Sequence, residues 1–586
     1  MNRFRFAFAL GCLLFSASPA FAAKEAIDAI PADAALVVRL KSPKTTLANV
    51  IRTVATFDPQ LAAAIQQGQA RIGGWVANPT LAGIDDGRDW WMAAFLREGA
   101  EPALAFAIPA KDPATMRLAV GAGFHFVTDG DLVFYTRDAE VAAAIEALVR
   151  GGEGSISATM SESSRAAFDA GDFSAYLHLA RVRELFRDDL DLICDELDAT
   201  LRLLEEHSAS PPGVDLPSVI AAYRTLAHAA LQSIEDAEGL AVGARLDAKG
   251  LDLEQYFAVT PGSPTARALA AHSVSPLKLL EQLPPDSLAY VGIHGDAAGT
   301  LRRLAAWRSA FAGANDAARS ADASLLEELA ALDVGDLWWS FKLGQLADGA
   351  LEGAAIVAAR PPEQARELAR KLAASFPSHE AGGLRPAIAL RPDAEQNDDG
   401  TAADVLALRL VGNPAAPSLG AAGRIADVLI GPGEKTGRLA PLPDGLVATV
   451  GMTREKSAQL VQGVRDAQAG HPQANAVFAA TRSRLPEQAN LIVIADVAGI
   501  AHEALRLAID TGKYPLPVNH ELLKRLDLRR TYLGIGVAAD SAGVRVVAHV
   551  PAKQLEGLQK MSFLLRASGV PGFAPAADSP QPARRY

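Results

Sequence analysis

The chain has 586 residues, 49% of them hydrophobic, and a formal net charge of −12. An acidic chain without a cluster of Lys or Arg side chains is poorly suited to hold nucleic acid or an anionic lipid surface, and we expect neither as a partner. The length allows more than one folded domain and a large hydrophobic core.

The first 22 residues have the organisation of a secretory signal peptide. Arg3 and Arg5 precede a short apolar run over Phe6–Phe15, and Ala20-Phe21-Ala22 offers a cleavage site with small residues. The run is shorter than the roughly 20 residues of a membrane-spanning helix, and no later segment meets that requirement. We therefore expect cleavage near Ala22 and a mature protein that is periplasmic or secreted, without a transmembrane segment.

The chain has only two cysteines, Cys12 and Cys194. Cys12 follows Ala9-Leu10-Gly11, as in a lipoprotein signal, but almost no apolar run separates it from Arg5, which argues against lipid attachment. Loss of the signal peptide leaves Cys194 alone, so the mature chain has no internal disulfide and depends on its core for stability. Cys194 falls in an apolar helical stripe, and we interpret it as a buried small hydrophobic residue.

Residues 23–270 form the first of two similar series of elements. Pro31-Ala32-Asp33 precedes a predicted strand over 34–40, and an amphipathic helix is predicted around 45–54. A strand containing Trp90-Trp91 follows, and Asp129-Gly130 then predicts a hairpin turn because Gly tolerates positive φ.

A helical hairpin over 179–234 is special to this first copy. Its apolar residues step by three or four and so share one helical face: Leu179, Val182, Phe186, Leu190, Ile193, Leu197, Leu201 and Leu204. Pro211-Pro212-Gly213 ends the helix, and residues 219–234 predict an antiparallel return helix.

The second copy, residues 277–570, repeats the series. The segment Leu81–Trp91 corresponds to Leu329–Trp339, which aligns Trp90-Trp91 with Trp338-Trp339. Leu283-Pro284-Pro285-Asp286 precedes a strand over 287–293 and a helix around 297–311, and Asp444-Gly445 predicts the second hairpin turn.

An insertion over 375–437 distinguishes the second copy. It predicts two strands, 387–391 and 405–411, that flank a polar loop. The tail over 571–586 is rich in Pro, Ala and Ser and is predicted to be disordered.

These patterns predict an α+β fold in two tandem related copies, with amphipathic helices packed on antiparallel sheets. The series Pro31-Ala32-Asp33, Asp85–Trp91, Asp129-Gly130 and 155–173 resembles an exported bacterial family known as a domain of unknown function. The resemblance implies strand-helix modules that begin with Pro-x-Asp. It implies no known activity and supplies no catalytic residues.

The sequence predicts no metal and no cofactor. His502-Glu503 and His520-Glu521 each lack the second histidine of a zinc helix. Residues 395–400 begin like a calcium loop, but its twelfth position is Leu406 instead of Glu. Glu434 stands where a phosphate-binding loop needs Gly.

A cell-envelope hydrolase with a site assembled from distant residues is one alternative. Ser275-Pro276-Leu277-Lys278 together with Lys435-Thr436-Gly437 is similar to motifs of the serine acyltransferases that process cell-wall peptides. Pro276, however, disfavours the helix that such a serine begins. A cleft that holds Ser275, Lys278 and Lys435 together would favour an enzyme.

The Trp pairs are the candidate binding residues. Adjacent strand residues point to opposite faces, so a pair can place one indole in the core and the other on the second face. Core packing is the ordinary role of Trp. In the sharper interpretation, Trp90, Trp91, Trp338 and Trp339 form a platform for a glycan or lipid.

We expect a non-catalytic envelope protein that binds another envelope protein, a lipid or a glycan. A structural or chaperone-like scaffold is a further alternative. A solvent-facing Trp beside an apolar groove would favour binding, whereas a filled core without a groove would favour the scaffold. A unique site is expected where the copies diverge, in 179–234 or 375–437.

Overall fold

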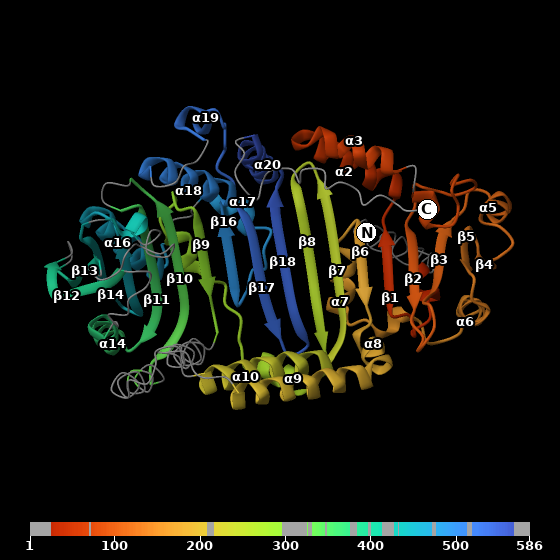
Figure 1. Ribbon diagram of the computed structural model, residues 1–586, viewed down its shortest axis with the longest axis horizontal. Coiled ribbons are helices and arrows are strands. Elements are labelled where there is room, and N and C mark those ends of the chain that lie inside the picture. Colours follow the sequence, from red (N-terminus) through yellow and green to blue (C-terminus); the bar gives the residue numbers. More distant parts are fainter. Residues whose placement is uncertain are drawn as a thin grey trace, which may run out of the picture. The chain divides into compact units, whose positions relative to one another are not determined.

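The computed structural model describes residues 25–567 except 70–71, 208–215, 296–324, 326–327, 329–330, 346–348, 376–383, 397–399, 413–426, 432, 472–475 and 513–517 (Figure 1). The predicted signal peptide, the helix expected around 297–311 and the tail over 571–586 lie outside these residues. Helices and antiparallel strands make up the described chain, which confirms the predicted α+β class.

The chain forms two compact units. Unit 1 comprises the described residues of Met1–Ala48, Ala64–Phe186 and Gly239–Gly243, and unit 2 comprises those of Asn49–Ala63, Arg187–Glu238 and Ala244–Tyr586. Three elements have residues in both units: α2 (Pro43–Phe57), α3 (Pro59–Gln69) and β7 (Ala237–Asp247).

Unit 1 contains six strands in one antiparallel sheet, in the order β4-β5-β3-β2-β1-β6. Its elements are η1 (Ala26–Ala29), β1 (Leu36–Leu40), α4 (Ile72–Trp75), β2 (Trp90–Phe95), β3 (Ala103–Pro109), α5 (Pro113–Val120), β4 (His125–Asp129), β5 (Leu132–Thr136), α6 (Ala139–Val149), η2 (Ile156–Thr159), α7 (Glu162–Asp169), β6 (Phe173–Leu177) and α8 (Leu179–Leu185). The Asp112 side chain caps α5 by accepting hydrogen bonds from the backbone of Ala114 and Thr115.

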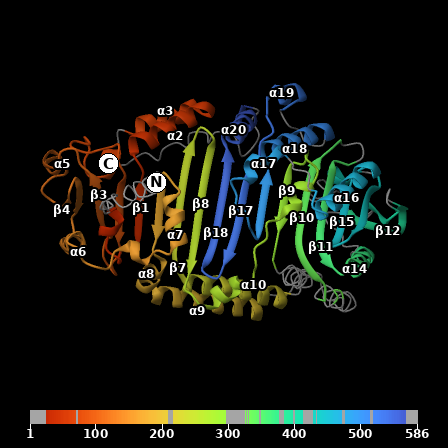
Figure 2. The ribbon, with the colours of Figure 1, turned by 180° about the vertical axis from the view of Figure 1, so that it is seen from behind.

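Unit 2 contains an antiparallel sheet in the order β12-β13-β14-β15-β11-β10-β9-β16-β17-β18-β8, which Figures 1 and 2 show from opposite sides. Its strands are β8 (Gly250–Val259), β9 (Ala289–Ile293), β10 (Asp333–Leu343), β11 (Leu351–Arg360), β12 (Leu384–Gln396), β13 (Ala402–Gly412), β14 (Lys435–Leu442), β15 (Gly445–Val450), β16 (Leu491–Ala495), β17 (Leu533–Asp540) and β18 (Gly543–Pro551). Its helices are α9 (Arg187–His207), α10 (Leu216–Glu235), α11 (Pro264–Ala270), η3 (Lys278–Gln282), α14 (Pro362–Ser375), α16 (Arg454–Gln468), α17 (Ala476–Arg482), α18 (Val497–Thr511), α19 (His520–Lys524) and α20 (Ala552–Ala567).

Six strands follow the same order in both units. The order β4-β5-β3-β2-β1-β6 of unit 1 matches β14-β15-β11-β10-β9-β16 of unit 2, and every pair is antiparallel. The backbone N–H that follows each opening strand makes the same bond: Lys41 donates to Asp172, and His294 donates to Asn490, both at 2.7 Å.

The strand registers shift the predicted Trp alignment by one residue. Trp91 lies opposite Arg39 in β1, and Trp338 lies opposite Gly292 at the same place in β9. Trp338 therefore corresponds to Trp91, and Trp339 corresponds to Met92.

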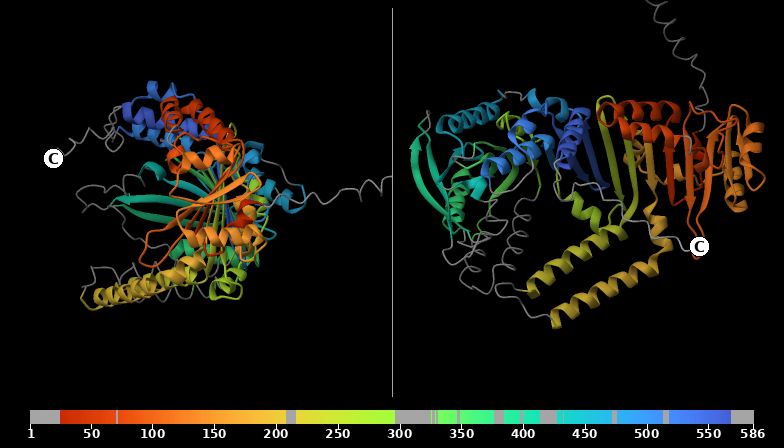
Figure 3. Two further views of the ribbon diagram at one scale, coloured as in Figure 1. Left: turned by 90° about the vertical axis from the view of Figure 1, so that its right-hand side faces the viewer. Right: turned by 45° about the horizontal axis from the view of Figure 1, so that its top comes forward.

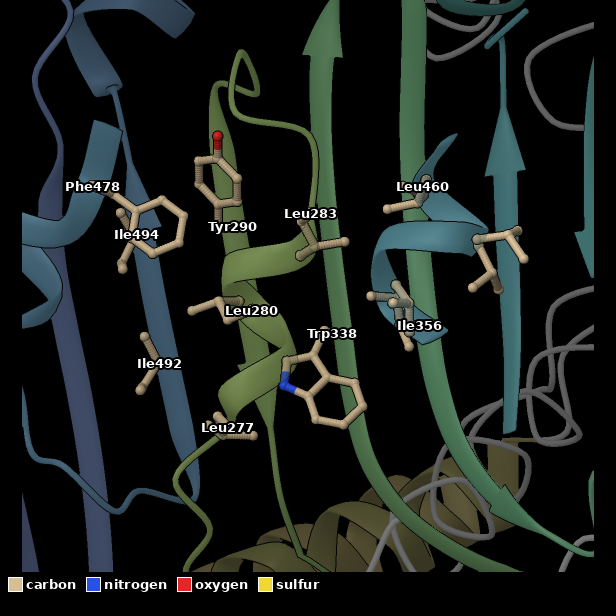
Figure 4. Packing of buried hydrophobic residues seen from close by; sticks show 14 of the residues in the cluster. Leu277, Leu280, Leu283, Tyr290, Trp338, Ile356, Leu460, Phe478, Ile492 and Ile494 are labelled. Carbon is tan, nitrogen blue, oxygen red and sulfur yellow. The ribbon is translucent and has the colours of Figure 1, made fainter. Parts of the chain in front are cut away.

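The core of unit 2 lies between one face of its sheet and the segment that contains η3 (Figure 4). Leu280 and Leu283 of this segment pack in a cluster with Tyr290 of β9, Trp338 of β10 and Ile492 of β16. Tyr290 is 0% exposed, and its ring centroid lies 4.7 Å from that of Phe478. The alternation of strand side chains assigns the neighbouring residues to the other face of the sheet.

In the two segments in which the copies were expected to diverge, the single helix predicted from Leu179 is divided at Phe186 into α8 and α9, and the return helix is present as α10. Helices α9 and α10 lie side by side (Figure 3), and Arg224 of α10 donates to Glu205 of α9 at 3.0 Å. The predicted strands of the insertion are present as β12 and β13, which are longer than expected and pair with each other. The residues expected to end α9, 211–213, lie outside the described chain.

Candidate functional site

Trp90 and Trp91 are both buried, 5% and 6% exposed, on opposite faces of β2. Trp90 belongs to the hydrophobic cluster of unit 1, and its Nε1 donates to the Asp85 carbonyl at 3.1 Å. Trp91 stacks on Phe168 with 5.8 Å between ring centroids, and the Arg39 guanidinium lies 5.6 Å from its ring. Neither indole presents a broad face to solvent.

Trp91 nevertheless lines a pocket of about 570 Å³ in unit 1, together with Arg39, Ser42 and Asp89. Arg39 and Asp89 already have partners within the fold. Arg39 donates to the Asp169 carboxylate and to the Gly171 carbonyl, both at 3.1 Å, and the Asp89 carboxylate accepts the Ser42 N–H at 3.1 Å. We therefore assign these polar groups to the stability of unit 1.

The second Trp pair is divided between core and surface. Trp338 is 3% exposed and packs in the core cluster of unit 2. Trp339 is 36% exposed and stacks on Phe341, with 5.8 Å between ring centroids and 19° between ring planes. Of the four predicted platform residues, Trp339 is the one whose indole reaches solvent.

Trp339 lies on an apolar sheet surface that we call the open face, on the opposite side of the sheet from the core cluster. The alternation and the registers assign to it half-buried or exposed side chains of six neighbouring strands: Leu251, Leu253, Phe257, Ile293, Leu337, Trp339, Phe341, Leu491, Val493, Leu533, Ile535, Val537, Val544, Val546, Ala548 and Val550. Among the residues of these strands that share this face, only Gln255 is polar. Ile293 is 40% exposed.

The same side of the sheet is covered further along by a helix. Ala365 and Leu368 of α14 pack in one cluster with Leu439 of β14 and Leu446 of β15. The registers place Leu439 and Leu446 on the side that carries Trp339. An apolar sheet surface is thus packed by a helix at β14 and β15 and remains accessible at Trp339 and Ile293.

The α9–α10 hairpin of unit 2 also exposes large apolar side chains: Leu192, Ile193, Leu203, Leu204, Tyr223, Leu226 and Ile234 are each 45–58% exposed. Leu201 and Ile220 are buried at 4%. Cys194 of α9 is half-buried instead of fully buried as expected. Partial burial and the nearby carboxylates of Glu235 and Asp191 raise the pKa of its thiol.

A polar pocket of about 400 Å³ lies elsewhere in unit 2, between the residues that precede β9 and helix α16. Lys342 in its wall donates to Asp286 at 2.6 Å and lies 3.1 Å from Glu352. Burial lowers the pKa of the Lys342 ammonium, but these two carboxylates outweigh it and raise the pKa. The Lys342 ammonium is therefore already paired with two carboxylates of this pocket.

The serine and lysines of the predicted hydrolase motif have separate partners. Ser275 donates to Asp336 at 2.9 Å, whereas the buried Lys435 donates to the Gly349 carbonyl at 2.6 Å and Lys278 is exposed on η3. The geometry thus gives Ser275 a carboxylate partner that sequence spacing did not indicate.

Within the described residues, no group of three or more His, Cys, Asp or Glu side chains is arranged to hold a metal ion. No helix among those residues is long and apolar enough to cross a membrane. No family model, curated protein or solved structure matches the chain.

Proposed function

We propose that the protein binds the acyl chain of a lipid on the open face of unit 2. The observation that carries the proposal is the exposed indole of Trp339 within a sheet surface that is apolar over six strands. Exposed apolar surface costs free energy in water, and a ligand that covers it recovers about 25 cal/mol for each Å². Export to the periplasm or outside the cell is part of this proposal and rests on the predicted signal peptide.

Two properties favour an acyl chain as the ligand. The acidic charge of the chain argues against an anionic membrane surface, and the apolar composition of the open face argues against a glycan. A net charge of −12 repels anionic headgroups. A glycan needs a ring of hydrogen-bonding groups around the aromatic residue, and the open face offers Gln255 alone. The resemblance to an exported family of Pro-x-Asp modules, and descent from two tandem copies, are compatible with this function and stay proposals.

Binding can be measured by quenching of tryptophan fluorescence with a brominated fatty acid, because bromine quenches at contact. Trp75, 78% exposed in unit 1, is the matched control for Trp339. We expect the mature protein and Trp75→Phe to be quenched with the same Kd. Trp339→Phe should lose most of the saturable quenching.

A second pair of variants separates binding from the optical probe. Ile293→Asp places a charge on the open face, and Leu118→Asp places one at an 85% exposed apolar residue of α5 in unit 1. Because a carboxylate is costly in an apolar contact, Ile293→Asp should raise the Kd for a radiolabelled fatty acid by more than tenfold. Leu118→Asp should leave this Kd unchanged. Equal affinity in all variants, or no saturable quenching of the wild type, would refute the proposal.

A further inference from the structure

Ser273, His294 and Asp336 of unit 2 form a chain of side-chain hydrogen bonds. The Ser273 Oγ lies 2.8 Å from His294 Nε2, and His294 Nδ1 lies 2.5 Å from Asp336 Oδ1. These residues are distant in sequence but come together because Ser273 precedes η3, His294 follows β9 and Asp336 lies in β10. Ser273 is exposed, and the side chains of His294 and Asp336 are 20% and 17% exposed.

For an ionised carboxylate and a neutral imidazole, these contacts have one direction of proton donation. An ionised carboxylate only accepts, so His294 Nδ1 donates to Asp336. The neutral imidazole then accepts at Nε2, and the Ser273 hydroxyl donates to it. This is the order of a nucleophile, a general base and an orienting carboxylate that activates serine in acyl transfer, a constellation recognised by geometry and not by sequence order.

Two more residues hold this chain in place. Ser275, 9% exposed, donates to the second oxygen of Asp336 at 2.9 Å, so both carboxylate oxygens have a partner. Asn490 donates from its side chain to the Ser273 carbonyl at 2.7 Å, and its own carbonyl accepts the His294 N–H at 2.7 Å. The backbones of Ser273 and His294 are therefore tied to one residue.

Unit 1 has residues at the positions that correspond to Asp336 and His294, and these allow a comparison. By strand order and register, Asp89 corresponds to Asp336 and Lys41 to His294. The Asp89 carboxylate there accepts only a backbone N–H, that of Ser42, at 3.1 Å. An acid at this position thus serves the fold in unit 1, whereas unit 2 has a histidine where unit 1 has Lys41.

We propose that Ser273 is the nucleophile of an esterase site, with His294 as general base and Asp336 and Ser275 as positioning residues. Ser273 Oγ attacks the ester carbonyl carbon while its proton moves to His294 Nε2. The bond from this carbon to the alcohol oxygen breaks, and the alcohol leaves with the proton from His294. Water, activated by His294, then cleaves the acyl-serine, so that ester and water become carboxylic acid and alcohol.

The surroundings define the class of ester. Ile293, next to the base, is 40% exposed and pairs with Leu337, which follows Asp336 and lies on the open face. The alternation of strand residues places Ile293 and Leu337 on the opposite side of the sheet from His294 and Asp336, so the ester that fits is an uncharged carboxylic ester whose apolar acyl chain reaches past the end of β9 to the open face. This preference for the acyl group rests on the proposed function, whereas the assignment of the catalytic residues does not.

The test uses the full mature protein and two probes. A fluorophosphonate should label the wild type, and mass spectrometry should find the adduct on Ser273. p-Nitrophenyl octanoate should be hydrolysed about tenfold faster than p-nitrophenyl acetate at equal concentration. Equal rates would remove the acyl preference but leave the catalytic residues, which distinguishes failure of the open face from failure of the triad.

Variants complete the test. Ser273→Ala and His294→Ala should each lose at least about 100-fold in kcat, and neither should react with the fluorophosphonate. Ser483→Ala, at an exposed serine that bonds only within its own helix end, should keep the full rate. Ser275→Ala should lower kcat with KM unchanged, because it acts through Asp336. No adduct on wild-type Ser273, or an undiminished rate in Ser273→Ala, overturns the proposal.

Discussion

Asp404 of β13 anchors the insertion of unit 2 by a buried charge cluster, and its removal should loosen that segment. The carboxylate is 0% exposed and accepts hydrogen bonds from Arg366 at 2.6 Å and from Arg370 at 2.7 Å, both residues of α14. Asp393 lies in the same cluster, with its N–H donated to Asp404 at 3.0 Å and its own carboxylate 2.9 Å from Arg366. The helix and the β12–β13 hairpin are thereby joined.

The substitution Asp404→Asn keeps the shape of the side chain and removes its charge. Breaking a buried ion pair costs about 3–5 kcal/mol. The Asp393 carboxylate still pairs with Arg366 and Arg370 in the variant, so we expect a cost near the lower limit, about 3 kcal/mol. A loss of that size raises the local opening equilibrium by about 100-fold. Amide hydrogen exchange of peptides from 384–396 and 402–412 should accelerate accordingly.

Asp444→Asn is the matched control, because its ion pair with Arg360 lies at the surface, where the two side chains are 49% and 64% exposed. It should change exchange by less than about threefold, as expected of a solvent-screened pair. If Asp404→Asn accelerates exchange in the hairpin no more than Asp444→Asn does, the buried cluster does not anchor the insertion.

The same cluster predicts a dependence on pH. Burial raises the pKa of Asp404, but donation from Arg370 and Arg366 and from the Asp393 N–H outweighs it and brings the pKa to about 2. A pKa below the unfolded value of 3.8 adds stability above about pH 4, and that stability is lost as the pH falls toward 2. The complete loss is roughly 2 kcal/mol, of which roughly 1.3 kcal/mol falls between pH 4 and pH 2.5. Hydrogen exchange at these two pH values, after correction for the intrinsic rate, measures this part, and it should vanish in Asp404→Asn.

Three further predictions concern stability and reactivity. Arg39→Met removes the guanidinium that donates to the carbonyls of Phe168 and Gly171, and this should destabilise unit 1 by about 2–3 kcal/mol, measured by hydrogen exchange of β1 and β6. Unchanged exchange in β1 would contradict this. Gly445→Ala should destabilise the protein by about 3 kcal/mol or more, and Gly130→Ala by about 1 kcal/mol. The reason is that a Cβ at residue 445 would lie 2.0 Å from the Val357 carbonyl oxygen, whereas the space around residue 130 is open. Thermal unfolding measures the difference, and equal shifts in Tm would refute it. Cys194, whose thiol pKa is raised by partial burial and nearby carboxylates, should react with iodoacetamide at pH 7.5 more slowly than free cysteine, and an equal rate would contradict that shift.

Local patterns in the sequence predicted several of the strands and helices, because each of these depends on side chains that are close in the chain. The Pro-x-Asp strands appear as β1 and β9, the Asp-Gly turns join β4 to β5 and β14 to β15, and the insertion forms β12 and β13. The α+β class follows from these elements. The order of the strands in the sheet was beyond the sequence, because it depends on pairing between residues that are far apart.

The Trp pairs show where such reasoning stops. Sequence spacing aligned Trp90 with Trp338, but the strand registers match Trp91 with Trp338, which moves the pair by one position and thereby exchanges the two faces. Which indole reaches solvent depends on that register, and only Trp339 does so among the four predicted platform residues.

The candidate esterase residues carried no signal in sequence spacing. Ser273 and His294 are 21 residues apart along the chain, and Asp336 lies 42 beyond His294, so no single element holds any two of them. The predicted motif contained Ser275, two residues away, and assigned it lysine partners. Its actual partner, Asp336, becomes apparent only when β9 and β10 are paired.

The two units suggest how new function arises on a repeated fold. We expected divergence in the added segments 179–234 and 375–437, yet the two candidate sites lie at positions that both units share. Trp339 stands where unit 1 has Met92, and His294 stands where unit 1 has Lys41. Because the paired strands fix the backbone at these positions in both units, a changed side chain there inherits a defined orientation. A residue in a long inserted loop would first have to be ordered at an entropic cost. Substitution at positions that both sheets share is therefore the shorter route to a site on this fold.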